Sequence, residues 1–194
     1  GCDANASATI DTADVVCTVL VFFGDTTCTE TGPLSAASAN PVVLSMPGDL
    51  AVNPNQAIEV PVALESLGND VAAVGFILQL DKSKVAFDAT DGDGDGIPDS
   101  VNLNVPASLM RSVAYDAVAG QVKVAIADLT LPLATLADGT IATVTLSGVA
   151  TGTTELQFVH ASAGSTEGQS LTVIEKVGDG ASSNGRAFLP SVRK

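Results

Sequence analysis

The sequence contains little of what several function classes require. It has no tryptophan, one tyrosine and one histidine, and only 8 of its 194 residues are lysine or arginine. Binding to nucleic acid or anionic lipid needs clusters of basic residues, and the net charge of -14 opposes both. The longest apolar run, Val15 to Phe23, is far shorter than the roughly 20 residues of a membrane helix. The sequence therefore predicts no nucleic-acid partner and no membrane span.

Cysteine is also scarce and is confined to the N-terminal end, at Cys2, Cys17 and Cys28. In an exported protein this clustering indicates one disulfide and one remaining thiol. Cys17 with Cys28 is the preferred pair, but Cys2 with either partner is the alternative, and the odd thiol could cross-link subunits. The chain begins at Gly1, which predicts an extracellular or cell-surface protein whose signal peptide has been cleaved, although a trimmed sequence would look the same.

Catalytic groups are few. His160 shares its parity with Leu156 and Phe158 on an expected strand, which favours an edge or core residue over a catalytic base. No nucleophile elbow, phosphate-binding loop or zinc-ligand spacing is present. Four glutamates could supply a glycosidase pair, but each stands singly at a strand position that is usually exposed: Glu59, Glu65, Glu155 and Glu175. The sequence predicts that the protein is not an enzyme.

An apolar content of 46% is sufficient for a buried core. One helix is expected from Thr12 to Phe23, because apolar residues recur there at three-to-four spacing, and Gly24 ends it. The residues of that predicted apolar face are Val15, Val16, Val19, Leu20 and Phe23. Residues 29–40 are rich in Thr, Ser, Ala, Gly and Pro without periodicity, which is typical of a linker.

From Pro41 onward the apolar period changes to two, as in the alternating segment Ile58 to Leu64. Val71 to Leu80 is apolar at both parities, which predicts a central strand. Further strands are expected at Gln121 to Ala127, Thr140 to Leu146, Thr154 to Val159 and Ser170 to Val177. Many short strands without a second helix predict a mainly β fold, an antiparallel β-sandwich with jelly-roll or Greek-key connections.

These patterns divide the chain into four parts. Residues 1–28 form an acidic loop with the helix that follows it, 29–40 the linker, 41–178 the sandwich, and 179–194 a C-terminal tail, whose last residues, Phe188 to Lys194, follow the Gly- and Ser-rich segment Gly178 to Gly185. The tail could add a strand to the edge of a neighbouring sheet.

The first acidic loop has the spacing of an EF-hand loop. Its ligand candidates are Asp3, Asn5, Ser7, Thr9 through its backbone carbonyl, Asp11 and Asp14, with Ile10 expected to anchor the loop to a core. Ala8 replaces the usual glycine at the sixth position, and an aspartate rather than a glutamate closes the loop. The alternative is that Asp3, Asn5 and Asp11 are turn and N-cap residues ahead of the helix.

The second acidic loop repeats the spacing with a glycine, Gly96, at the sixth position. Its ligand candidates are Asp91, Asp93, Asp95, Ile97 through its backbone carbonyl, Asp99 and Asn102. Aspartates at alternating positions repel one another without a cation, which argues against the alternative of a solvated, flexible loop. Many oxygen donors in an adaptable loop favour Ca²⁺ over Mg²⁺, and the lack of a His or Cys cluster disfavours Zn²⁺. About two Ca²⁺ sites are expected.

The first 24 residues resemble one half of a dockerin, at Asp3, Asn5, Ser7, Asp11 and Asp14 followed by Val15 and Val16. Residues Pro41 to Val177 resemble a cohesin domain in four segments: Leu44 to Asp49, Ile58 to Leu64, Phe76 to Phe87, and Leu136 to Val144. The loop from Asp91 to Asn102 resembles a type 3 thrombospondin repeat. The resemblance implies a nine-stranded jelly-roll sandwich that binds a protein partner on one sheet face, and calcium that shapes the dockerin-like helix.

The functional hypothesis that follows is a secreted, calcium-binding structural or assembly protein. Its sandwich would bind a calcium-ordered helix, which could be its own, that of another copy, or that of another protein. A contact in trans between copies would propagate head to tail into a filament, a homopolymer. The alternative is a carbohydrate-binding or cell-surface adhesion module, against which the scarcity of aromatic residues counts, so a polysaccharide is the less favoured partner.

Overall fold

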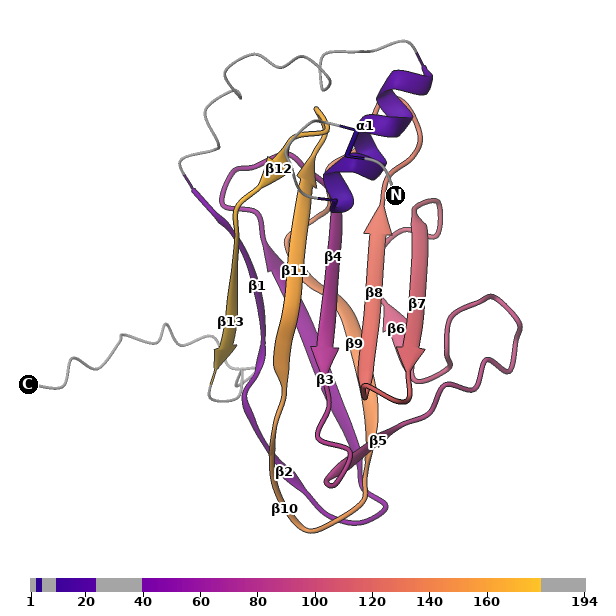
Figure 1. Ribbon diagram of the computed structural model, residues 1–194, viewed down its shortest axis with the longest axis vertical. Coiled ribbons are helices and arrows are strands. Elements are labelled where there is room, and N and C mark those ends of the chain that lie inside the picture. The colour runs from indigo at the N-terminus through magenta and orange to yellow at the C-terminus, as the bar shows by residue number, and fades with distance from the viewer. Residues whose placement is uncertain (1–2, 5–9, 24–39, 179–194) are drawn as a thin grey trace, which may run out of the picture.

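The computed structural model describes residues 3–4, 10–23 and 40–178. The described part is a two-layer β-sandwich with one helix lying on it, which confirms the predicted fold class (Figure 1). The predicted linker, apart from Asn40, and the C-terminal tail lie outside the described residues. The elements are α1 (Thr12–Phe22), β1 (Val42–Pro47), β2 (Asp49–Val52), β3 (Ala57–Glu65), β4 (Val71–Gln79), β5 (Val85–Phe87), β6 (Val101–Leu103), β7 (Met110–Asp116), β8 (Gln121–Ala127), β9 (Gly139–Gly148), β10 (Gly152–Glu155), β11 (Gln157–Ser165), β12 (Ser170–Leu171) and β13 (Val173–Gly178).

One layer is a six-stranded sheet in the order β13-β1-β3-β9-β5, with β6 also paired to β9. The other is a five-stranded sheet in the order β12-β11-β4-β8-β7, and β2 and β10 form a small two-stranded sheet. Pairing is antiparallel except between β1 and β13, which run parallel, a departure from the all-antiparallel expectation. No helix in the described part of the chain is long and apolar enough to cross a membrane.

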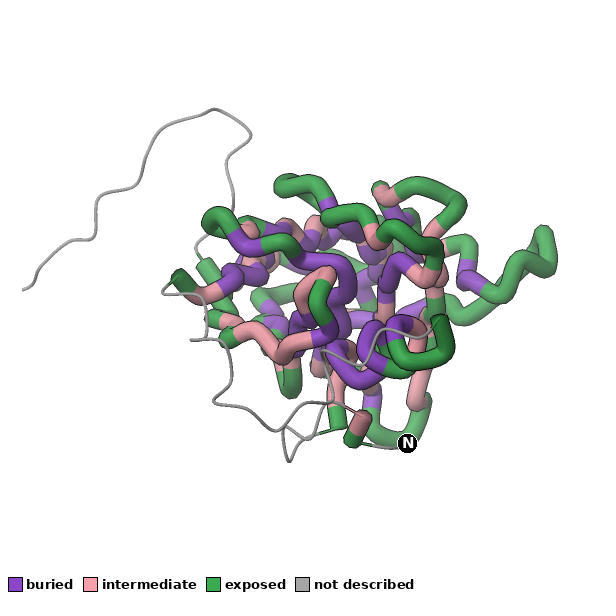
Figure 2. Tube along the Cα trace, turned by 90° about the horizontal axis from the view of Figure 1, so that it is seen from above, coloured by how far each residue is buried: buried purple, intermediate pink, exposed green. Residues whose placement is uncertain are grey.

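The period-two pattern places the core between the two sheets. In β3 the alternating residues Ile58, Val60, Val62 and Leu64 are buried, as predicted. Strand β4 lies centrally between β11 and β8, as predicted from its apolar residues at both parities. Both faces of β4 are covered, because one packs on the core and α1 lies over part of the other. Figure 2 shows the buried residues gathered inside the sandwich, with exposed loops around them.

Two segments that were predicted to be single strands each form two. Between Thr154 and Val159 the chain leaves β10 and enters β11, and between Ser170 and Val177 it leaves β12 and enters β13. In each case the two strands belong to different sheets. Leu156, at the first break, is fully buried. The physical reason is that a strand can switch sheets at a corner of a sandwich without interrupting its apolar pattern.

The predicted helix is present at Thr12–Phe22, but its buried face differs from the predicted one. The buried apolar side chains are Ala13, Val16, Cys17 and Leu20, whereas Val15 is 38% exposed and Phe23 is 60% exposed. The helix approaches Gly75 and Gly164 of the sheet at close range through Thr12 and Ala13, and this contact sets which face of the helix is buried. Val15, Phe22 and Phe23 lie on the other side and point to solvent.

Candidate functional site

The second acidic loop joins β5 to β6 and projects from the side of the sandwich (Figures 1 and 2). Residues 88–96 are exposed, and Ile97 and Pro98 are buried. Ile97 belongs to the hydrophobic core of the sandwich. The loop is thus anchored at one point, while its acidic residues stay in solvent.

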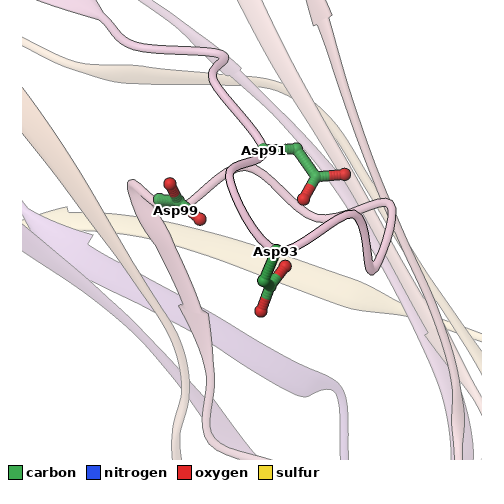
Figure 3. Close-up of side chains that lie close together, drawn as sticks. All are labelled: Asp91, Asp93 and Asp99. Atoms are coloured by element: carbon green, nitrogen blue, oxygen red, sulfur yellow. The ribbon is translucent and has the colours of Figure 1, made fainter.

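Three carboxylates of this loop gather at one place (Figure 3). Asp91, Asp93 and Asp99 each offer an oxygen that lies within 4.8 Å of the oxygens offered by the other two. A Ca²⁺ ion binds oxygens at about 2.3 to 2.6 Å, so two ligands on opposite sides of it are about 5 Å apart. The three oxygens are therefore close enough together to bind one calcium ion, and the donor set consists of the hard oxygens that calcium prefers.

Backbone amides hold two of these carboxylates in place. Asp91 accepts hydrogen bonds from the amides of Gly94 at 2.8 Å and Gly96 at 2.9 Å, and Asp99 accepts one from Gly92 at 3.2 Å. Gly96 has a φ of 85°, in the left-handed region where other residues are strained, which explains the glycine at this position. A carboxylate has about four lone-pair sites, so these bonds leave acceptor capacity for a cation.

The base of the loop is closed by further hydrogen bonds. The Asp99 amide donates to the Thr90 carbonyl at 2.8 Å, and the Ser100 hydroxyl donates to the Asp88 carbonyl at 2.6 Å. The amide and hydroxyl of Thr90 both donate to the Asp88 carboxylate. Asp88 thus orders the entry to the loop. This role was not predicted from the sequence, although an aspartate two residues before a threonine is a recognisable turn signal.

The same hydrogen bonds favour ionised carboxylates. The Gly96 amide is the main cause that holds the pKa of Asp91 below its ordinary value, and the slight burial of the group opposes it. The Thr90 hydroxyl, together with the Thr90 amide, lowers the pKa of Asp88. These two carboxylates therefore keep their negative charge at mildly acidic pH, as ligands of a cation must.

Two other predicted ligands of this loop lie elsewhere. The Asp95 carboxylate accepts the Ile97 amide at 2.8 Å and is not part of the three-carboxylate group. Asn102 lies on β6, opposite Thr143 of β9. Asp91, Asp93 and Asp99 are thus the predicted ligands that the structure brings together, and coordination by Asp95, Ile97 or Asn102 stays a prediction.

The first acidic loop is described only at its ends, since Asn5, Ser7 and Thr9 lie outside the described residues. Asp11 is the N-cap of α1 and accepts the Ala13 amide at 2.8 Å. Asp14 is 4% exposed and accepts the Asp11 amide at 2.8 Å and the Ala4 amide at 2.7 Å. The Asp11 side chain also accepts the Asp14 amide, and this bond and the bond from the Asp11 amide to Asp14 form a capping box. The alternative interpretation predicted this N-cap role of Asp11. Calcium binding by Asp3, Asp11 and Asp14 stays a prediction.

The expectation that Ile10 anchors the first loop to a core is wrong, because the Ile10 side chain is 65% exposed. The anchor is instead the helix itself, through its buried face. Cys17 on that face is fully buried and disulfide-bonded. Both candidate partners, Cys2 and Cys28, lie outside the described residues, so the choice between them stays open.

Helix α1 packs on the outer face of the five-stranded sheet, over β11, β4 and β8 (Figure 1). A small apolar cluster forms the contact: Val16, Cys17 and Leu20 of the helix with Ala72, Ala73 and Ala127 of the sheet. Hydrogen bonds join the two at Thr12 and Ser162, whose hydroxyls are 3.3 Å apart, and at Ser170, whose hydroxyl donates to Asp11 at 3.0 Å. The helix docks on the sandwich of its own chain.

Two glycines within strands make this close approach possible. A Cβ atom on Gly164 of β11 would lie 2.8 Å from Cα of Ala13, and one on Gly75 of β4 would lie 2.8 Å from Cγ2 of Thr12. Glycine inside a strand weakens it and commonly marks such an approach. These two glycines within strands are the signal in the sequence that could have located the docking face.

A groove continues this interface beside the N-terminal end of α1. It has a volume of about 300 Å³ and is lined by Ile10 and Val15 from the helix side and by Ile77, Ala114 and Lys123 from the sheet. His160 also lines it. The alternation with Leu156 and Phe158 predicted an edge or core position for His160. The alternation is broken by a register shift in β11 between Phe158 and His160, which turns His160 to solvent.

The sequence matches no family model and no curated protein. Its structure is similar to several solved cohesin modules. The sixth cohesin of scaffoldin B from Acetivibrio cellulolyticus, solved in complex with a Cel5 dockerin, has a TM-score of 0.53 and 18% identity over 72% of this chain and 96% of that one.

Two further structures agree. Type II cohesin A11 from Bacteroides cellulosolvens has a TM-score of 0.53 and 11% identity, over 70% of this chain and 95% of its own. CaCohA2 from Clostridium acetobutylicum has a TM-score of 0.51 and 17% identity, over 73% of this chain and 94% of its own. At these identities the likeness establishes the fold, and the sandwich of this chain therefore has the jelly-roll β-sandwich fold of the cohesin modules.

Proposed function

We propose that this chain is a non-enzymatic, secreted, calcium-binding structural protein that makes protein contacts through its sandwich and the helix docked on it. The observation that carries the proposal is the seat of α1 on the five-stranded sheet. Gly75 and Gly164 remove the side chains that would block the helix, and Thr12, Ser162 and Ser170 fix its position. The outer face of this sheet is thus shaped to receive a helix.

The similar structures support a protein partner. One of the cohesin modules above is described in complex with a dockerin, so a sandwich of this fold can receive another protein module. In the present chain a helix already occupies part of the face, in cis. Further protein contacts would then use the outward side of α1 and the uncovered part of the sheet beside it.

Calcium binding in the second acidic loop is part of the proposal. Asp91, Asp93 and Asp99 would hold the ion, and its charge would offset the repulsion among their carboxylates. The backbone amides already aimed at Asp91 and Asp99 keep these ligands in place. The bound ion would stiffen a loop that is anchored to the core by Ile97.

A structural rather than catalytic role is supported by where the candidate acids lie. Glu59, Glu65, Glu155 and Glu175 are all exposed, and they lie on three different strands, β3, β10 and β13. A glycosidase needs two carboxyl groups that face each other across a substrate, at about 5 to 10 Å. Such glutamates are better explained as solvated residues of the sandwich surface.

The experiment that tests the function is sedimentation velocity of the full chain over a wide concentration range, with Ca²⁺ and then with a chelator. We expect species larger than a monomer with Ca²⁺ and a shift towards monomer after chelation. A chain that stays monomeric under both conditions, and binds oligosaccharides on a glycan array, would instead establish the carbohydrate-binding alternative.

A further inference from the structure

The helix α1 presents an unusual amount of apolar surface to solvent. Of the twelve large apolar side chains that are exposed among the described residues, five belong to residues 10–23. The largest of these side chains are Phe22, 82% exposed, and Phe23, 60% exposed. Their rings contact each other edge to face, with the ring centroids 5.3 Å apart. The whole chain has only seven aromatic residues. Contiguous exposed apolar patches mark protein interaction sites, whereas apolar side chains that are exposed singly need no explanation.

This aromatic pair lies at the C-terminal end of α1, away from the groove. Figure 1 shows that the helix runs obliquely past the ends of β4 and β8, so that its C-terminal end lies beyond the sheet. The groove lies beside the N-terminal end of the same helix and has Ile77, Ala114 and Ala125 on its sheet side. A protruding apolar end and an apolar groove thus occupy different parts of one molecule.

We propose that Phe22 and Phe23 of one copy insert into the groove beside α1 of a second copy. The inference rests on the proposed assembly function and names its partner and its contact. Because the two halves of the contact lie on different parts of the surface, the contact is heterologous and leaves one free half on each copy. Addition of copies then continues head to tail, and each joint buries two aromatic rings of about 150 to 250 Å² each.

Charge favours a second copy as the occupant. The groove is lined by one basic side chain, Lys123, and one acidic side chain, Asp11, in a chain whose net charge is -14, so copies repel one another less here than elsewhere. The C-terminal end of a helix carries a partial negative charge, and the last turn of α1 contains no basic residue to offset it. Lys123 of the receiving copy supplies that cation.

The contact also extends an interface that already exists. Ile10 and Val15 line the groove from α1, and Gly75 and Ser162 lie both in the groove and under the helix. An incoming helix end would therefore pack against the docked helix and the same sheet face together. This arrangement makes the docked α1 a part of the receptor surface and not merely its occupant.

The test uses two variants of the full chain that each destroy one half of the contact. Phe22→Ser with Phe23→Ser removes the protruding half, and Ala114→Glu blocks the groove with a longer side chain that repels the helix end. Ala114 is exposed on the edge strand β7, so its change leaves the fold intact. The matched control is Val118→Ser, since Val118 is 91% exposed in the turn between β7 and β8.

In sedimentation velocity with Ca²⁺ we expect wild type and Val118→Ser to associate, and each of the two contact variants to remain monomeric with wild-type circular dichroism. Mixing the two contact variants should give a one-to-one dimer and nothing larger. One variant keeps only an intact groove and the other keeps only an intact aromatic end, so each molecule can make a single contact. Lys123→Gln should weaken association by about two- to five-fold, and added salt should weaken it similarly.

Each remaining outcome overturns the inference. If wild type associates and both contact variants associate equally well, the contact lies elsewhere and the proposed function stands. If the variants are folded monomers that do not dimerise when mixed, the contact is not heterologous. If wild type is monomeric throughout, both the inference and the assembly function fail. Hydrogen exchange of the dilute monomer provides one more check. If the amides of Ile77 and Ala125 are better protected than those at the uncovered end of the sheet, a segment of the same chain covers the groove.

Discussion

The two acidic loops of this chain have the same spacing of oxygen donors, but the structure uses their carboxylates differently. In the loop from Asp91 to Asn102, three carboxylates gather in solvent, and glycine amides hold two of them, those of Asp91 and Asp99. In the loop from Asp3 to Asp14, Asp11 and Asp14 cap the helix, and Asp14 is buried. Equal spacing along the chain therefore does not imply equal chemistry.

The difference follows from what comes after each loop. A strand follows Asp99, so the Asp99 carboxylate has no helix end to cap. It accepts the amide of Gly92. A helix follows Asp11, and the first amides of a helix lack partners within the helix. The carboxylates of Asp11 and Asp14 satisfy those amides. The first loop thus ends in the cap of a helix, whereas the second gathers three carboxylates in solvent.

The largest effect is expected from removing the gathered carboxylates. Asp91→Asn with Asp93→Asn should weaken calcium binding by on the order of 100-fold, because two charged ligands are lost together. Calorimetric titration with Ca²⁺ measures this, and the rise of the Tm with free Ca²⁺ should shrink in parallel. The control is Asp116→Asn, since Asp116 also accepts turn amides, those of Val118 and Ala119, but is not part of the group. Unchanged affinity in the double variant would remove the second loop as a calcium site.

The next largest effect tests whether the docking of α1 depends on its close approach to the sheet at Gly164. Gly164→Ala places a Cβ atom 2.8 Å from Cα of Ala13, an overlap that backbone atoms cannot avoid without the helix moving. Overpacking of this kind costs about 1 to 3 kcal/mol. We expect faster hydrogen exchange in α1 and little change in the exchange of β3 and β9.

The control for this change is Gly178→Ala, because a Cβ atom on Gly178 has nothing within 4 Å. Equal protection of α1 in Gly164→Ala and wild type would show that the helix does not depend on this close approach.

A smaller effect is expected from the cap of the helix. Asp14→Ala removes the acceptor of the Asp11 and Ala4 amides and should cost about 1 to 2 kcal/mol in the free energy of unfolding. The loss should be equal with Ca²⁺ and with a chelator if Asp14 serves as a cap alone. Chemical denaturation under both conditions measures it. A markedly larger loss with Ca²⁺ would establish that the first loop also binds the ion.

The smallest effect concerns pH. The pKa of Asp91 lies below its ordinary value of 3.8, chiefly because of the Gly96 amide. A carboxyl with a lowered folded pKa stabilises the folded chain above its unfolded pKa, and that contribution is lost as the pH falls through the folded pKa. A carbon-detected NMR titration of the calcium-free protein should therefore give an Asp91 midpoint below 3.8. A midpoint at or above that value would mean that the amides of the second loop do not hold its carboxylate.

Much of the fold was predictable from local patterns. The period-two segment from Ile58 to Leu64 predicted β3, the apolar segment from Val71 to Leu80 predicted the central strand β4, and helical spacing gave α1 within one residue at its end. The breaks at Leu156 and Thr172 were not predictable, because a strand that switches sheets keeps its apolar pattern. The outward turn of His160 depended on a register shift that the sequence does not mark.

The sequence by itself determined the class of the fold, the place of the helix and the presence of acidic loops with calcium-type spacing, since these depend on short-range periodicity and on residue chemistry. Only the tertiary structure decided which face of α1 is buried, and where on the sandwich the helix docks. The physical reason is that both depend on contacts between residues far apart in the chain. Gly164 admits Ala13, and Ser170 binds Asp11, across separations that no local pattern spans.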